Sequence, residues 1–331
     1  MNEQLSRRDR AIQRQRAYAF LAKTFAEGLS PAVLEMAKEL PILVVVLPEE
    51  YDQDQASAEH QDLFGFNVLP YAGVYLNEDG QLGGRIHLDL NSWYNAFEFM
   101  PSNDSGVPDH ITTQLEFLAF LSGLDVKTHE SSATDLMNVT ILHKQGEFLG
   151  TQVVTWIFPF LMALKAQKNP FYSEVAALTE ALVISHCIEM GIRRDSVFAL
   201  PAMEEDILSN KQTGLKDIAT FLCRPALSGI YLTRKDIKRI AGSLEIPTGF
   251  GDRIQTLSNT LRSAVTFDTL PSLINELRER VLFFKRGYEG LCESTNEGLN
   301  QVIKQWILRT EGTLKILDDL DVQLAKLTQT D

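Results

Sequence analysis

A seven-residue repeat of apolar side chains near the end of the chain constrains the fold most. Apolar residues recur at alternating steps of four and three from Leu270 to Leu291, and a second such run extends from Leu299 to Leu327. A repeat of this period aligns the apolar side chains along one seam of a helix. The two runs therefore predict a pair of long antiparallel helices that pack along that seam.

The rest of the sequence also has a helical period. Apolar residues fall at helical spacing from Ala17 to Phe25 and again from Phe148 to Leu164, where Pro159 should kink the helix. Segments with a strand-like period are short and isolated. We therefore predict an all-α protein, a compact multi-helix bundle plus a C-terminal helical extension that contains the long antiparallel helix pair.

The net charge of −13 is distributed unevenly along the chain. Residues 26–206 carry 27 Asp and Glu against 8 Lys and Arg, whereas residues 207–331 carry 15 against 17. The change coincides with a polar segment that ends at Gly214, and it predicts a domain over 1–206 and a helical extension over 207–331. An acidic surface attracts basic partners and repels nucleic acid.

Signatures of catalysis and of cofactor binding are absent from the sequence. It contains no GxxxxGK[ST], GxGxxG, GxSxG, HExxH or CxxC motif. We predict that the protein is not an enzyme and binds no metal or cofactor. Three widely spaced cysteines indicate a reducing cytoplasm, and no uninterrupted apolar run reaches the ~18–20 residues of a membrane span, so no stable membrane insertion is expected.

One ordered set of segments resembles a known protein family. Residues 59–76 contain a Leu-Phe pair and a proline-aromatic loop that ends in Tyr-Leu, and Pro-Asp-His-Ile opens a helix at residues 108–111. Over about residues 10–205 this order and spacing resemble the TorD/DmsD/NarJ family of redox-enzyme maturation chaperones. The segment from about residue 207 onward matches nothing in the compact members of that family.

The resemblance implies a cytoplasmic, non-enzymatic chaperone. Such proteins bind the apo catalytic subunit of a molybdenum oxidoreductase, often through its twin-arginine signal peptide, until the molybdopterin cofactor is inserted. A signal peptide has a cationic end and an apolar stretch, so an acidic rim beside an aromatic groove would suit it. Matching the motifs residue by residue places the apolar part of the peptide site at Leu63, Phe64, Pro70, Tyr71 and Tyr75. The same matching places its polar part at Asp109 and His110.

Simpler interpretations of these residues stay open at this point. Asp109 has the residue type and position of an N-cap for the helix that follows it. Leu63 and Phe64 have the residue types of a protein core. The heptad seam is expected to be internal packing, with dimerisation as the alternative, so the protein is expected to be a monomer or a homodimer.

A DNA-binding regulator is the alternative function class. Residues 232–264 faintly resemble a helix-turn-helix, in which Thr233 and Asp236 have the spacing of a capping box that opens a helix over Arg234–Ser243. The next helix, which would enter the DNA groove, carries few basic residues. Because the protein is also acidic, we expect no nucleic-acid partner. The basic side chains that would face phosphates are Arg234, Lys235, Lys238 and Arg239.

Overall fold

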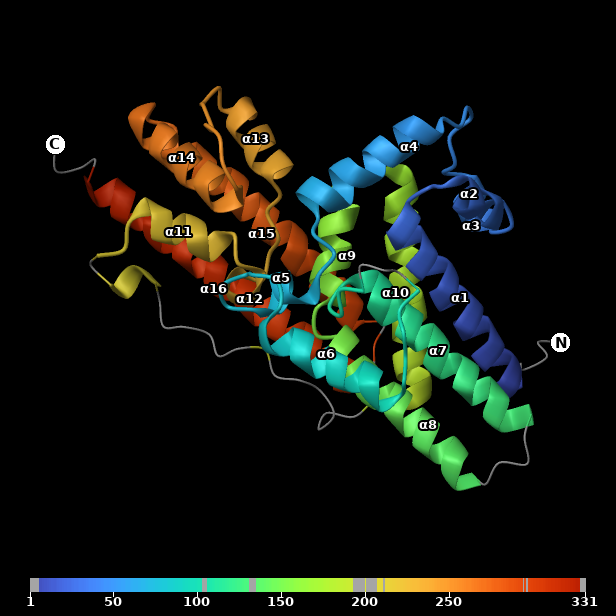
Figure 1. The fold of residues 1–331 in the computed structure, drawn as a ribbon. Helices are drawn as coiled ribbons and strands as arrows, with labels where there is room; N and C mark the ends of the chain where they lie inside the picture. The colour runs from blue at the N-terminus through green and yellow to red at the C-terminus, as the bar shows by residue number, and fades with distance from the viewer. Residues whose placement is uncertain are drawn as a thin grey trace.

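The fold was analysed in a computed structural model, which describes residues 6–102, 106–130, 135–192, 200, 207–210, 212–293, 295 and 297–327 (Figure 1). Every regular element in these ranges is a helix, and no strand occurs among them. One isolated antiparallel bridge joins Tyr71 and His110. The prediction of an all-α fold is confirmed.

Helices cover most of the chain up to residue 190. Several begin at a side chain that accepts a hydrogen bond from an otherwise unpaired backbone N–H, as Ser6 does for α1 and Ser30 for α2. Their bounds are α1 Arg7–Glu27, α2 Pro31–Lys38, α3 Pro41–Val44, α4 Gln53–His60, the π-helix η1 Gln61–Asn67, α5 Ala72–Leu76, α6 Gly84–Ala96, α7 Ile111–Glu130, α8 Asp135–Phe148, the π-helix η2 Leu149–Val153, α9 Ile157–Lys165 and α10 Pro170–Met190.

The C-terminal extension is helical as well. The capping box of Thr233 and Asp236 is present, and the two long helices of the heptad pattern pack along each other, as predicted. The bounds are the 3₁₀-helix η4 Ile207–Ser209, α11 Leu215–Leu222, α12 Pro225–Ser228, α13 Arg234–Ser243, α14 Arg253–Thr266, α15 Leu270–Cys292 and α16 Glu297–Leu327.

The helix predicted over Phe148–Leu164 breaks before its proline. Helix α8 continues into η2, and α9 begins at Ile157 after a bend of 58°. Pro159 lies in the first turn of α9, where a backbone N–H has no partner within the helix. The chain bends next to Pro159, as predicted, but the bend is a break between two helices and not a kink within one.

A single hydrophobic cluster extends across the predicted boundary between 1–206 and 207–331. Tyr231 of the extension stacks on Tyr75 with ring centroids 5.1 Å apart, and its hydroxyl donates to the Asn67 carbonyl at 3.0 Å. The indole N–H of Trp306 donates to the Thr155 carbonyl at 3.1 Å. The boundary itself includes residues 201–206, which lie outside the described ranges, and the division into two domains stays a prediction.

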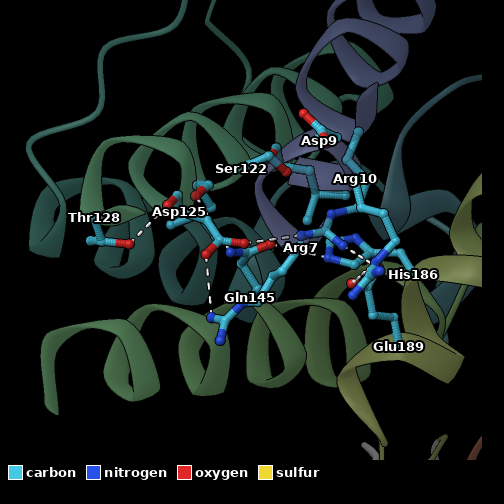
Figure 2. A network of polar contacts seen from close by, with 12 residues as sticks. Arg7, Asp9, Arg10, Ser122, Asp125, Thr128, Gln145, His186 and Glu189 are labelled. Atoms are coloured by element: carbon cyan, nitrogen blue, oxygen red, sulfur yellow. Dashed lines mark hydrogen bonds and ion pairs between the residues drawn. The ribbon is translucent and has the colours of Figure 1, made fainter. Parts of the chain in front are cut away.

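Buried charges connect α1 to α7 and α10 (Figure 2). Arg14 is buried on α1 and contacts Asp125 of α7 at 3.0 Å and also Glu189 of α10. Arg7 and Arg10 on the same helix contact Asp125 at 3.4 Å and Glu189 at 2.9 Å. Because a buried guanidinium needs a partner, this arginine series fixes the position of α1 against both helices.

Among the described helices, α10 is long and apolar enough to cross a membrane. The bent pair Val139–Val153 plus Ile157–Lys165 is long and apolar enough only if its two parts are counted as one span. Glu174 and Glu180 interrupt the apolar residues of α10, which is why no such segment was predicted there. The helix packs against α1, α8 and α9, and 44% of its apolar window is buried inside the protein. Core helices of soluble proteins commonly have this length and apolar composition.

Replacing Tyr231 by Phe tests whether both parts of the chain unfold together. The hydroxyl accepts from Leu69 N at 3.1 Å in addition to its bond to Asn67. Its loss leaves two backbone groups without that partner, so we expect Tyr231→Phe to lower the free energy of unfolding by ~1–3 kcal/mol. Urea denaturation followed by tryptophan fluorescence should show one transition, shifted to lower denaturant.

The matched control is Tyr51→Phe, which removes a hydroxyl with one bond, to the Leu29 carbonyl, inside the first segment. It should shift the same single transition by a smaller amount. Two separate transitions, of which Tyr231→Phe moves only one, would mean that residues 1–206 and 207–331 unfold independently.

Candidate functional site

The loop between η1 and α5 crosses the start of α7 and is held there by backbone hydrogen bonds. Ala72 N donates to the Asp109 carbonyl at 2.9 Å, and Ile111 N donates to the Pro70 carbonyl at 2.9 Å. These bonds flank the bridged pair Tyr71 and His110. The two segments of the predicted peptide site, whose paired residues are 37 to 41 positions apart in the sequence, therefore meet in space.

Asp109 anchors this crossing through its side chain. The residue is fully buried, and Oδ2 accepts from Gly73 N at 3.1 Å. A Cβ atom at Gly73 would lie 3.0 Å from this oxygen and 2.9 Å from the Gln81 carbonyl, so the position requires glycine. The Asp109 side chain thus bonds to a distant loop. At the start of α7, the backbone N–H of Thr112 donates to Nδ1 of His110 at 3.2 Å.

The second carboxylate oxygen of Asp109 has no hydrogen-bond partner in the described structure. The imidazole of His87 on α6 lies close by, with Nδ1 3.9 Å from Oδ1. Burial raises the pKa of Asp109, while the Gly73 amide and His87 oppose that rise. A carboxylate in this position would gain from a further hydrogen-bond donor or cation.

His110 is neutral near pH 7. Burial lowers its pKa to about 4, and the charge of His60 contributes in the same direction. Because Nδ1 accepts from Thr112 N, the proton of the neutral ring lies on Nε2. The ring packs edge-on against Tyr71 with centroids 4.8 Å apart. At this pH His110 therefore offers a ligand a neutral N–H donor and not a positive charge.

Gln114 links the crossing to the aromatic core. Its Nε2 donates to the Asp109 carbonyl at 3.3 Å, and its Oε1 accepts from the indole N–H of Trp156 at 3.1 Å. A carboxylate here would lack the amide donor. The sequence did not indicate this role, because Trp156 is distant in the sequence and Asp109 takes part through its backbone carbonyl.

Most of the proposed apolar contacts are buried. Phe64 packs edge-on against Phe25 and Tyr172, and Tyr75 packs against Trp156 and Tyr231. Leu63 and Pro70 are buried as well, whereas Tyr71 and His110 are partly exposed. The exposed ring of η1 is Phe66, which is 53% accessible and was not selected from the sequence.

A cavity of about 620 Å³ lies beside this crossing, between the 77–86 loop, α6 and η2. Its walls include the carboxylates of Glu78, Asp79 and Asp89, of which Asp89 lies 3.6 Å from Arg85. The amide of Asn77 donates to the carbonyls of Gln81 at 2.7 Å and Gly83 at 3.3 Å and so holds the loop closed.

The N-terminal half of the chain is similar to known proteins. The sequence profile of the family described as nitrate reductase delta subunit matches residues 23–162. The chaperone protein TorD of Aliivibrio fischeri is 26% identical over 170 residues, which cover 48% of this chain and 77% of that protein. A TorD of Vibrio vulnificus is 24% identical over 169 residues, covering 49% of this chain and 73% of that one. No solved structure matches the chain.

Residues 23–162 of the chain match the TorD/NarJ family. The family resemblance predicted from the ordered motifs is confirmed. All seven residues that the motifs assigned to the peptide site lie inside the matched range, 23–162, while the C-terminal extension lies beyond it. Peptide contact by these individual residues stays a prediction.

The histidines of this region predict a loss of stability in mild acid. Burial lowers the pKa of His110, His60 and His186 in the folded chain, so the unfolded chain binds protons more readily. Their contribution to stability is complete above about pH 6.5 and is lost as the pH falls toward the folded pKa. The raised pKa of Asp109 acts in the opposite direction.

Replacing His110 by Asn isolates one of these groups. The Oδ1 atom of Asn can still accept from Thr112 N, but it does not titrate. For the parent we expect His110 alone to account for up to about 2 kcal/mol of the stability lost between pH 6.5 and 5.0. Urea denaturation at both values should show a smaller loss for His110→Asn. His143→Asn, at an exposed position on α8, should behave as the parent does; an equal change in both variants would contradict the assignment.

Proposed function

We propose that this protein is a system-specific chaperone for a molybdenum-containing oxidoreductase. It binds the apo catalytic subunit, keeps it competent for insertion of the molybdopterin cofactor and then releases it. The family match over residues 23–162 carries this proposal, because it spans the whole crossing of the 70–73 loop with Asp109 and His110. The relatives named as TorD chaperones support it.

The recognition element that we propose is a peptide with a cationic end and an apolar stretch, as in a twin-arginine signal peptide. From residue 39 to residue 84 the chain contains nine Asp and Glu and no Lys or Arg. This segment includes the acidic residues of the 620 Å³ cavity that precede α6. Such a surface accelerates and strengthens binding of a cationic peptide, and added salt screens it.

The seven residues predicted for the peptide site divide into two groups by exposure. Tyr71 and His110 reach the surface, and for these we propose direct contact with the client. The other five are buried, and we propose that they hold the crossing in shape. For Asp109 we propose a second role, in which the carboxylate oxygen without a hydrogen-bond partner attracts a cation of the client. A bound peptide gains from a preformed surface, because less conformational entropy is lost on binding.

Other features fit a binding protein that works in a reducing cytoplasm without catalysis. All three cysteines are free. Burial raises the pKa of Cys187 and raises that of Cys223 to about 12, so neither thiol forms the thiolate that a nucleophile needs. No cluster of three potential metal ligands occurs in the part of the chain that the structure describes.

Two of the four basic residues named for the DNA-binding alternative, Lys235 and Arg239, have carboxylate partners in the structure. Arg239 lies 3.3 Å from Asp236, and Lys235 lies 3.9 Å from Asp62. The guanidinium of Arg253 lies over the ring of Tyr231, 4.2 Å from its centroid. These side chains therefore support packing within the protein, and no comparison favours nucleic-acid binding.

Calorimetric titration with a twin-arginine signal peptide and its scrambled form tests the proposal. The parent should prefer the intact peptide, with affinity that falls as salt is added. Asp109→Asn keeps an acceptor for Gly73 N and should keep the melting temperature, but it should weaken binding by ~0.5–3 kcal/mol if the carboxylate meets a cation of the client. Asp109→Ala should lose the Gly73 bond, at ~1 kcal/mol of stability, as well as binding.

Binding by Asp109→Asn that equals the parent's would remove Asp109 from the peptide site but leave the chaperone assignment in place. The chaperone function itself is tested in cells that lack the gene for this protein. The client oxidoreductase should accumulate there as inactive apoprotein, and the parent gene should restore its activity. Full activity of the client without the protein would contradict the proposed function.

A further inference from the structure

A second concave surface lies at the end of the molecule where α2, α3 and α4 meet the start of α10, well separated in Figure 1 from α5 and α6. We call it the α4–α10 groove. It has a volume of about 450 Å³. Its inner wall is apolar and includes Leu29, Pro48, Tyr51, Phe171 and Tyr172. None of the residues of the crossing at Asp109 lines it.

The groove is bordered by an exposed run of apolar residues. Val45 lines it and is 80% accessible, and its neighbour Val46 lines it as well. Ile42 and Val44 on α3 are also exposed beside them in the chain. Single exposed apolar residues are common on proteins, but several together mark an interaction surface.

Part of the lining of the groove, which we call its acidic edge, carries carboxylates. Glu50, Asp52 and Glu59 line it, and no Lys, Arg or His does. Asp52 accepts from Gln55 N at 3.0 Å, and Glu59 accepts from the Asn169 amide at 3.2 Å. These donors are uncharged, so the negative charge of the edge is not neutralised by them. A partner with a positive charge would complement it.

Two hydrogen bonds fix the walls of the groove in advance. Asn169 caps α10 by accepting from Tyr172 N at 3.1 Å and also donates to Glu59, which joins α10 to α4. The Tyr51 hydroxyl donates to the Leu29 carbonyl at 2.9 Å and holds the chain after α3 against the turn between α1 and α2. A preformed groove lowers the cost of ordering a bound segment.

We infer that the α4–α10 groove is a docking site for a peptide segment in which apolar side chains adjoin an arginine or lysine. The apolar side chains pack between Val45 and Phe171, and the cation lies at Glu50 and Asp52. The inference rests on the proposed function only in assigning this segment to the client polypeptide. An anionic membrane surface would be repelled by the same carboxylates.

Fluorescence anisotropy with the full chain and a labelled twelve-residue peptide, containing two adjacent arginines and four leucines, tests the inference. Both groove variants alter exposed side chains and should leave the fold intact. Glu50→Lys inverts a charge at the acidic edge and should weaken binding by about 10-fold. Val45→Ser removes apolar contact and should weaken it by about 3- to 10-fold.

Matched controls place the same changes elsewhere. Glu293→Lys, at the exposed end of α15, alters the net charge as Glu50→Lys does, and a lysine is favourable at a helix C-terminus. Val322→Ser alters an exposed valine on α16. Both controls should bind as the parent does. Because a protein of net charge −13 attracts any cationic peptide, they separate local contact from general attraction.

Three results would overturn the inference. The first is an equal effect of Glu50→Lys and Glu293→Lys on peptide binding, and the second is no binding of the peptide by the parent. The third is binding of the parent to phosphatidylglycerol vesicles, abolished by Val45→Ser, while the peptide stays unbound. Failure of the proposed function is a separate outcome, read from the activity of the client oxidoreductase. If the client matures without this protein while the groove variants lose peptide binding, the groove remains a peptide-binding site and the chaperone assignment is wrong.

Discussion

The packing of Tyr75 is the contact on which most of the described structure depends. Its ring lies against Trp156 and Phe160 of the α8–α9 region and stacks on Tyr231 of the C-terminal extension. Helix α5, which carries Tyr75, starts where the backbone bonds to Asp109 end. The crossing near Asp109, the aromatic core and the extension therefore hold one another in place, and a change in one alters the environment of the others.

Electrostatics works differently at the surface and in the interior. In the interior, arginines meet carboxylates directly, as Arg280 does with Asp236 at 2.7 Å and Arg14 with Asp125. At the surface, the segment from residue 39 to residue 84 contributes negative charge without any Lys or Arg of its own. Interior pairs define the positions of helices, whereas unbalanced surface charge is available to a partner.

The elements that could be predicted from the sequence are those set by local pattern. The heptads predicted α15 and α16, and the spacing of Thr233 and Asp236 predicted the start of α13, since both signals lie within a few turns of chain. The partner of Asp109 could not be predicted, because Gly73 lies 36 residues away and is recognised through its backbone N–H. The motif resemblance brought the two segments together without specifying this bond.

A π-helix determines which aromatic ring of the Leu-Phe segment is exposed. Periodicity arguments assume 3.6 residues per turn, and η1 inserts a wider turn over Gln61–Asn67. Phe64 then faces Phe25 and Tyr172, while Phe66 points outward. Such a turn is rare in a helix and often occurs at functional sites, but its hydrogen-bond pattern leaves no signature in residue spacing.

The C-terminal extension has a direct structural connection to the family region. The Tyr231 hydroxyl bonds the carbonyl of Asn67, the last residue of η1, and the N–H of Leu69, which precedes the crossing. The family match ends at residue 162 and so does not include Tyr231. In this protein, therefore, the loop that carries Tyr71 toward His110 is positioned partly by residues outside the family match, and changes in the extension can alter the candidate site without contacting a client.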